Sequence, residues 1–194
     1  SELKIMNGDP DGNFRLDDFV TRAEFTKMLN SAIGNTAETD INFPDVKSGK
    51  WYYNDVQKGV AAGFISGKSN GDFAPDAKIT RQETAVMLSR IVPTSGSNAT
   101  LKVYSDYKNV EYWAETALEK ITAKGYLGAY NDGKLHPKDN LTRGQAAKIL
   151  TLVLQKETID KNNKRIVAHD GSDIVLKDTI YANNMTIDAT AKDD

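Results

Sequence analysis

The chain has 194 residues, 39% hydrophobic and 27% charged, with a formal net charge of −2. This composition is typical of a globular protein, and the slightly negative net charge is unfavourable for binding nucleic acid through a broad positive surface. The apolar runs of the chain are far shorter than the about 20 residues of a membrane-spanning helix, so no membrane insertion is expected. With no cysteine and only two histidines, His136 and His169, the chain offers little for a metal site, a cofactor or nucleophilic catalysis, and a non-enzymatic protein is expected.

Three copies of one pattern follow one another along the chain. Each copy contains the dipeptide Thr-Arg, beginning at Thr21, Thr80 and Thr142, with spacings of 59 and 62 residues. Nine residues before each of these threonines stands a glycine, and an apolar anchor follows two residues after that glycine. The pairs of glycine and anchor are Gly12 with Phe14, Gly71 with Phe73, and Gly133 with Leu135. This register predicts a repeat protein.

Each complete unit predicts a first helix that begins near a tryptophan, a glycine turn, an irregular loop and a second helix behind Thr-Arg. The third copy supports its first helix best, because Trp113, Leu118 and Ile121 recur at helical spacing before Gly125. In the second copy Gly59 weakens the corresponding helix by about 1 kcal/mol. One unit cannot enclose a core, so three must pack together, either closed around a pseudo-threefold axis or as an open stack.

The repeats divide the chain into four segments. Residues 1–35 form the first unit. The second and third copies open with an aromatic-x-Asp segment, Phe43-Pro-Asp45 and Tyr104-Ser-Asp106, and the first unit is expected to be incomplete because this segment and most of its first helix are absent. Residues 41–93 and 101–156 form the second and third units. Residues 157–194 are expected to be a linker and the start of a downstream β-prone region. The predicted fold class is mainly α, with three helix–loop–helix repeats and a short β-prone tail.

The Thr-Arg dipeptide is typical of a helix start. A threonine followed three residues later by Glu or Gln forms a capping box, and all three copies have this spacing. Capping leaves the arginine unexplained, because Arg22, Arg81 and Arg143 occupy the first helical position, where the helix dipole disfavours a cation. Three such arginines in register suggest a binding site for an anion.

Two kinds of group at these positions would attract an anion. A helix N-terminus offers unpaired backbone N–H groups, and a guanidinium matches a carboxylate with two parallel hydrogen bonds. The alternative is an internal salt bridge from each arginine to an aspartate of a neighbouring unit, such as Asp45 or Asp106. The residues alone leave both interpretations open.

These motifs resemble the S-layer homology (SLH) module over roughly residues 3–155. In the second copy the matching residues are Phe43-Pro-Asp-Val46, Trp51, Gly63-Phe-Ile-Ser-Gly67, Gly71-Asp-Phe73 and Ile79-Thr-Arg-Gln-Glu83. In the third copy they are Trp113-Ala114, Gly125-Tyr-Leu-Gly128, Pro137 and Leu141-Thr-Arg-Gly-Gln145. The first copy matches only through Gly8, Gly12, Phe14 and Thr21-Arg-Ala-Glu24.

The resemblance implies a pseudo-threefold arrangement, with the first helices in a central bundle and the second helices as prongs. It also implies a secreted bacterial protein of the cell surface, cell wall or S-layer. Such a protein is attached without covalent bonds to a secondary cell wall polysaccharide, commonly a pyruvylated one, which binds in grooves between neighbouring modules. The alternative function is a structural module for S-layer self-assembly without glycan binding. Self-association through a region beyond the repeats stays open.

Carried over by motif, the resemblance implies a set of ligand-binding residues. Arg22, Arg81 and Arg143 would hold the pyruvate carboxylate. Asp45 and Asp106 would accept sugar hydroxyls from the adjoining module. Trp51 and Trp113 could offer an apolar face to a sugar, although an aromatic residue at a helix start more often belongs to the core. The motif glycines Gly67 and Gly128 complete the set.

Departures from the family pattern and other signals concern single positions. Leu16 replaces the loop proline of the other copies, Gly144 replaces an alanine, and the first copy has no counterpart of Asp45. The run from Asn7 to Gly12 has the start of a calcium-loop spacing but lacks the closing glutamate, so a polar turn is expected and no metal. His136 is expected at the surface without a partner.

Overall fold

A computed structural model describes residues 12–93, 100–160, 165–168, 180–182 and 185–187. The helices are α1 (Arg22–Ile33), α2 (Tyr53–Ala61), α3 (Arg81–Ser89), α4 (Glu115–Ala123) and α5 (Arg143–Lys156). Short 3₁₀ helices cover Leu101–Val103, Tyr107–Asn109 and Tyr112–Ala114. The mainly α fold class is confirmed. Within the described ranges, every helix is too short or too polar to cross a bilayer.

The second helix of each unit begins at a capping box, as predicted. In α1 the backbone N–H of Glu24 donates to Thr21 Oγ1 at 3.1 Å, and the Glu24 carboxylate accepts from Thr21 N at 2.7 Å. Thr80 and Glu83 repeat this exchange at the start of α3. At α5 the amide of Gln145 takes the place of the carboxylate. The motif threonines therefore define the three helix starts locally.

The three units close into a ring instead of forming an open stack. The apolar residues just before the threonines, Val20, Ile79 and Leu141, are fully buried. Each donates its backbone N–H to the carbonyl of another: Val20 to Leu141 at 2.9 Å, Leu141 to Ile79 at 2.9 Å, and Ile79 to Val20 at 3.0 Å. Three hydrogen bonds that return to their starting point require a pseudo-threefold axis through these residues.

The first turn of each second helix is covered by the loop of the next unit. In α1, Arg22 N donates to Ala77 O at 2.9 Å and Ala23 N donates to Pro75 O at 3.0 Å. The corresponding bonds are Arg81 to Asp139, Gln82 to Pro137, Arg143 to Asp18 and Gly144 to Leu16. Together with the capping boxes, these bonds satisfy the N–H groups that a helix start normally leaves unpaired. The expectation of open N–H groups for an anion is therefore wrong at all three starts.

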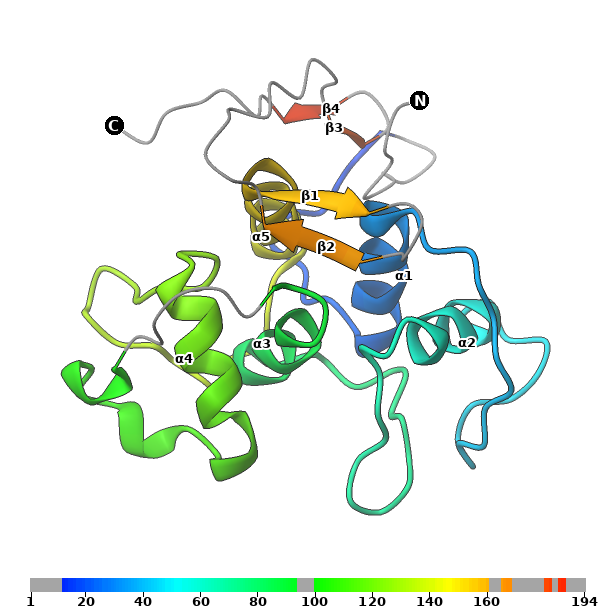
Figure 1. The fold of residues 1–194 in the computed structure, drawn as a ribbon, viewed down its shortest axis with the longest axis horizontal. Helices are drawn as coiled ribbons and strands as arrows, with labels where there is room; N and C mark the ends of the chain where they lie inside the picture. Colours follow the sequence, from blue (N-terminus) through cyan, green and yellow to red (C-terminus); the bar gives the residue numbers. More distant parts are fainter. Residues whose placement is uncertain (1–11, 94–99, 161–164, 169–179, 183–184, 188–194) are drawn as a thin grey trace.

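The helices that surround the centre are not those that the resemblance implies. Figure 1 shows α1, α3 and α5 in the middle of the molecule, with α2 and α4 on opposite sides. Each of these outer first helices packs on the second helix of the preceding unit, α2 on α1 and α4 on α3. The second helices lie at the centre because each begins just after one of the three residues that form the ring of hydrogen bonds, Val20, Ile79 and Leu141.

Gly59 has a packing reason to interrupt the helical pattern of α2. A Cβ at this position would lie 2.3 Å from Ile65 Cδ1 and 3.0 Å from the Phe64 ring. Both neighbours are buried and cannot move into solvent. We expect Gly59→Ala to lower the free energy of unfolding by about 1–3 kcal/mol through overpacking, although alanine favours a helix. Urea unfolding followed by circular dichroism measures this, and a gain in stability would contradict it.

Beyond α5 the structure describes two small antiparallel pairs. Strand β1 (Glu157–Asp160) pairs with β2 (Arg165–Ala168), and β3 (Ile180–Ala182) pairs with β4 (Met185–Ile187). All four strands lie within residues 157–194, where a linker and a β-prone region are expected from the sequence. Strand β1 occupies part of the segment from residue 157 onward that was expected to be a polar linker.

Candidate ligand-binding site

All three motif arginines connect neighbouring units through the same atom. Arg22 Nε donates to the carbonyl of Phe73 at 2.8 Å, and Arg81 Nε donates to that of Leu135 at 2.8 Å. Arg143 Nε closes the circle by donating to the carbonyl of Phe14 at 3.0 Å, across 129 residues of sequence. The acceptors are the apolar anchors of the repeat. The Nε edge of each guanidinium is therefore occupied by a contact that joins two units.

The remaining edges of the guanidinium groups differ between the three sites. Arg22 Nη1 forms an ion pair with Glu83 at 3.1 Å, and Arg143 Nη1 lies 4.0 Å from Glu24. Both partners are the glutamates of capping boxes, so the alternative of salt bridges to Asp45 or Asp106 is wrong in its choice of partner.

Arg81 faces the neutral Gln145 at the position that corresponds to Glu83. Its Nη2 instead donates to the carbonyl of Gly128, and its guanidinium lies over the ring of Tyr130, 4.4 Å from the ring centroid. Gln145 Nε2 donates in turn to the Tyr130 hydroxyl at 2.9 Å. The side chain of Arg81 is therefore enclosed by its own chain.

Asp45 and Asp106 hold the loops of their own units. Asp45 accepts from Phe73 N at 2.9 Å and from Ala74 N at 2.6 Å. Asp106 accepts in the same way from the backbone N–H groups of residues 135 and 136, at 2.9 and 2.8 Å. Because both oxygens of each carboxylate already bind within one unit, the structure gives these aspartates an internal role. A role toward sugar hydroxyls stays a prediction.

The aspartates stabilise an unusual backbone conformation. Ala74 and His136 have φ angles of 59° and 49°, which residues with a side chain rarely adopt. Arg15, at the corresponding position of the first unit, has φ 45°. That unit lacks the aspartate, and the side chain of Asn13 accepts from Arg15 N at 3.0 Å instead. A nearby amide thus replaces part of the missing contact.

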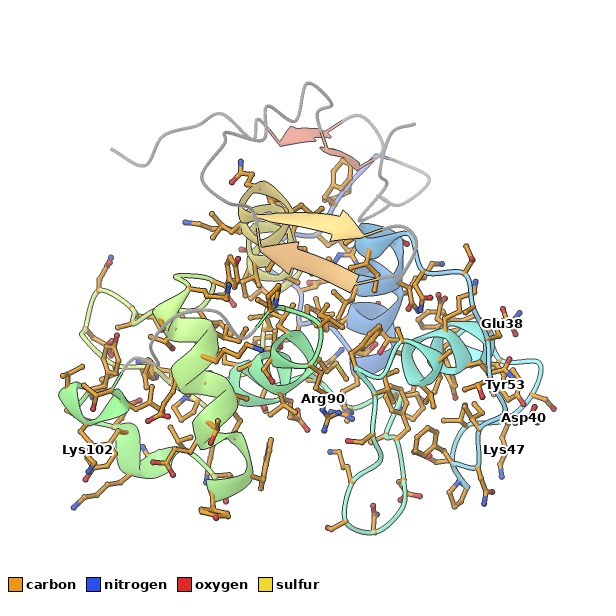
Figure 2. The ribbon with its side chains drawn as sticks, in the orientation of Figure 1. Glu38, Asp40, Lys47, Tyr53, Arg90 and Lys102 are labelled. Carbon is orange, nitrogen blue, oxygen red and sulfur yellow. The ribbon has the colours of Figure 1, made fainter. Side chains whose placement is uncertain are left out.

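A groove of about 500 Å³ lies beside Arg22, where all three units meet. Its residues come from α1, from the loop after α2, from α3 and from the start of the third unit. They are Arg22, Phe64, Ser66, Gly67, Lys68, Ser69, Glu83, Val86, Met87, Arg90 and Trp113. Figure 2 shows Arg90 at the end of α3, beside the loop of the second unit. This volume is within the range of small-ligand sites.

Positive charge dominates this groove. Arg22, Lys68 and Arg90 line it together with one carboxylate, that of Glu83. Burial lowers the pKa of Arg22, the charges of Glu83 and Asp45 oppose this effect, and the positive charge of Arg90 adds to it. The groove therefore favours an anion.

The two tryptophans are exposed, so the expectation that they belong to the core is wrong. Trp51 and Trp113 are both 55% exposed. Trp113 forms a wall of the groove. Trp51, its counterpart in the second unit, lies elsewhere, with Lys27 Nζ 5.6 Å from the ring centroid. The structure therefore brings only Trp113 together with Arg22.

The two motif glycines also differ in setting. Gly67 lines the groove, and a Cβ there would lie 3.0 Å from the Phe43 ring and 3.3 Å from two backbone oxygens. Gly128 has open space around it and contributes its carbonyl to Arg81. Gly67 thus lets its loop pack closely against Phe43, whereas Gly128 helps to close the site of Arg81.

Two departures from the repeat compensate each other. Gly144 N donates to Leu16 O at 2.9 Å, where the other units use the carbonyl of a proline. A Cβ on Gly144 would lie 3.3 Å from Leu16 O and 3.4 Å from Leu16 Cβ. The glycine therefore makes room for the leucine at the junction of the first and third units.

Sequence reasoning missed the groove residues that do not repeat. Arg90 corresponds to Ser31 and Leu152 in the other units, so no periodic signal marks it.

His136 was expected to be without a partner, but its ring lies 2.7 Å from Asp132 and 3.3 Å from Asp139. The hydrogen bond from His136 lowers the pKa of Asp132. The acidic run before Gly12 lies outside the described residues.

A known domain family and several known proteins are similar in sequence to this chain. A model of the S-layer homology domain matches residues 1–26, 42–85 and 103–147. An endoglucanase from Bacillus sp. (strain KSM-635) is 34% identical over 160 residues, which cover 80% of this chain and 17% of that enzyme. The surface-layer 125 kDa protein of Lysinibacillus sphaericus is 30% identical, covering 87% of this chain and 15% of its own length. The cellulosome-anchoring protein of Acetivibrio thermocellus is 29% identical, with coverages of 78% and 36%.

The matched region spans a minor part of each of these relatives, from 15% to 36% of their length. The endoglucanase matches over too little of its length for its activity to be carried over to this chain. The matched segments contain all three Thr-Arg motifs. The chain therefore belongs to the S-layer homology domain family, whose proteins are secreted and located at the bacterial cell surface.

Proposed function

We propose that this chain anchors the protein that contains it to the bacterial cell wall, by binding an acidic, pyruvylated secondary cell wall polysaccharide without catalysis. The observation that carries this proposal is the groove at Arg22, which combines three cations with the exposed face of Trp113. The name of the cellulosome-anchoring relative agrees with an anchoring role.

The groove has a group for each part of such a ligand. Arg22 Nη2 has no hydrogen-bond partner among the described residues, and this edge would receive the pyruvate carboxylate in competition with Glu83. The indole of Trp113 would pack against the apolar face of a sugar ring. Arg143 would offer a second, weaker site, whereas Arg81 would first have to leave Gly128 and Tyr130.

Replacing Trp113 tests the groove without disturbing the fold. Because its ring is exposed, Trp113→Ala is expected to leave stability unchanged and to weaken binding by about tenfold, or about 1.4 kcal/mol. Trp51→Ala is the matched control, since Trp51 occupies the corresponding position with equal exposure but does not line the groove. Calorimetric titration with purified pyruvylated wall polysaccharide measures both.

Two results would contradict the proposal. Equal loss of affinity in the two tryptophan variants would place the site elsewhere. Equal binding to native and depyruvylated polymer would remove the role of the carboxylate. A chain that self-associates but ignores the polymer would instead support the alternative of a structural module for S-layer assembly.

A further inference from the structure

The groove at Arg22 holds more positive charge than one ligand carboxylate requires. Glu83 offsets one positive charge and a single ligand carboxylate would offset a second, yet three cations, Arg22, Lys68 and Arg90, line the groove. Resting on the proposed function, we infer that the ligand of this groove is a saccharide with two separate anionic groups. Arg22 holds the first, and Arg90 with Lys68 holds the second.

Among the described residues that line the groove, Glu83 has the one carboxylate, and both of its oxygens already have partners. Glu83 Oε1 lies 3.1 Å from Arg22 Nη1 and 3.6 Å from Lys68 Nζ. Its other oxygen, Oε2, accepts from Thr80 N at 2.9 Å in the capping box. Glu83 is therefore shared between two cations and a helix start, and it provides no charge for Arg90.

Arg90 has a fixed position and no acidic partner. Its Nη1 donates to the carbonyl of Phe64 at 3.0 Å, which directs the guanidinium along the groove wall. No carboxylate of the described residues pairs with it, and partial burial lowers its pKa without an opposing negative charge. A cation held in this way, close enough to Arg22 to repel it, is stabilised when a second anion binds.

The repeat shows that the fold does not require these two cations. In the other units, serine and leucine correspond to Arg90, at positions 31 and 152. Tyr130 corresponds to Lys68 in the third unit and stacks on Arg81. Because these equivalent positions of the same scaffold hold neutral residues, the fold does not need the extra charge, which points to a ligand of this groove.

A pair of synthetic saccharides tests this inference on the intact chain. One carries a single pyruvyl ketal on one of two sugars, and the other carries a pyruvyl ketal on both. We expect the wild-type chain to bind the dianion about tenfold more tightly than the monoanion, the effect of one additional charge-assisted pair. We expect Arg90→Ala to reduce this preference to within about twofold, because it weakens binding of the dianion more than binding of the monoanion.

Two further variants make the test specific. Arg90→Lys keeps the charge and should retain part of the preference. Lys148→Ala removes an exposed cation of α5 that does not line the groove, and it should leave the preference intact. Circular dichroism of each variant checks the fold.

The outcomes separate this inference from the proposed function. If the wild-type chain binds both saccharides equally, the second anion site is refuted and the anchoring function stands. If Arg90→Ala lowers the affinity for both saccharides to the same extent, Arg90 belongs to the first carboxylate site and the inference is also refuted. If the chain binds neither saccharide, the proposed function itself fails.

Discussion

Replacing Arg22 with alanine is expected to lower the free energy of unfolding by about 3 kcal/mol, and the melting temperature by about 6–12 °C. The side chain is 5% exposed and joins two units through the Phe73 carbonyl and Glu83. Its removal leaves a buried carbonyl without a donor and a largely buried carboxylate without its cation, and both losses cost free energy. Thermal and urea unfolding measure the change.

A double-mutant cycle identifies the cause of this loss. In a background of Glu83→Gln, the effect of Arg22→Ala should be smaller by about 1 kcal/mol or more, because no unpaired charge is left behind. Arg90→Ala is the comparison, because it removes an exposed guanidinium of the same groove that has a single hydrogen bond, to the Phe64 carbonyl, and it should cost only about 0.5–1 kcal/mol. Equal effects of the two arginine variants would show that the junction between the units contributes little.

This stability effect changes how a binding experiment on the motif arginines is read. Judged from the sequence, an arginine-to-alanine change would remove a ligand-binding side chain without affecting the fold. In the structure the same guanidinium connects two units, so lost binding of Arg22→Ala would combine a missing contact with a loosened groove. Trp113 and Arg90 are better probes because they line the groove and are exposed.

Replacing Asp45 with alanine is expected to destabilise the chain by about 2–3 kcal/mol. Its carboxylate is the acceptor for two backbone N–H groups, those of Phe73 and Ala74, and each is left without a partner in the variant. The same contacts stabilise the positive φ of Ala74, which is strained for a residue with a side chain. Asp45→Asn, which keeps one acceptor oxygen, should lose about half as much.

A second-site change tests the role of the strained backbone. Glycine adopts positive φ without strain, so Ala74→Gly combined with Asp45→Ala should recover about 1 kcal/mol of stability. Asp76→Ala is the control, because Asp76 is an exposed carboxylate of the same loop. If Asp45→Ala behaves like Asp76→Ala in chemical denaturation, the internal role of Asp45 is wrong.

Features that depend on neighbouring residues could be predicted from the amino-acid sequence. The register of the three repeats, the capping boxes at Thr21, Thr80 and Thr142 and the family all follow from motifs that lie within single units. Capping joins residues three positions apart, so a short window of sequence contains both partners. The helices that these motifs predicted are present for the same reason.

The way in which the units meet, and the partners of their polar groups at these junctions, could not be predicted from the sequence and are seen only in the folded chain. The ring of hydrogen bonds at Val20, Ile79 and Leu141 and the bond from Arg143 to Phe14 join residues far apart in sequence. The exposure of the tryptophans and the charged groove at Arg22 likewise depend on which unit lies opposite. A repeat makes three positions look equivalent, but each faces a different neighbour, and the contacts between those neighbours decide which position can hold a ligand.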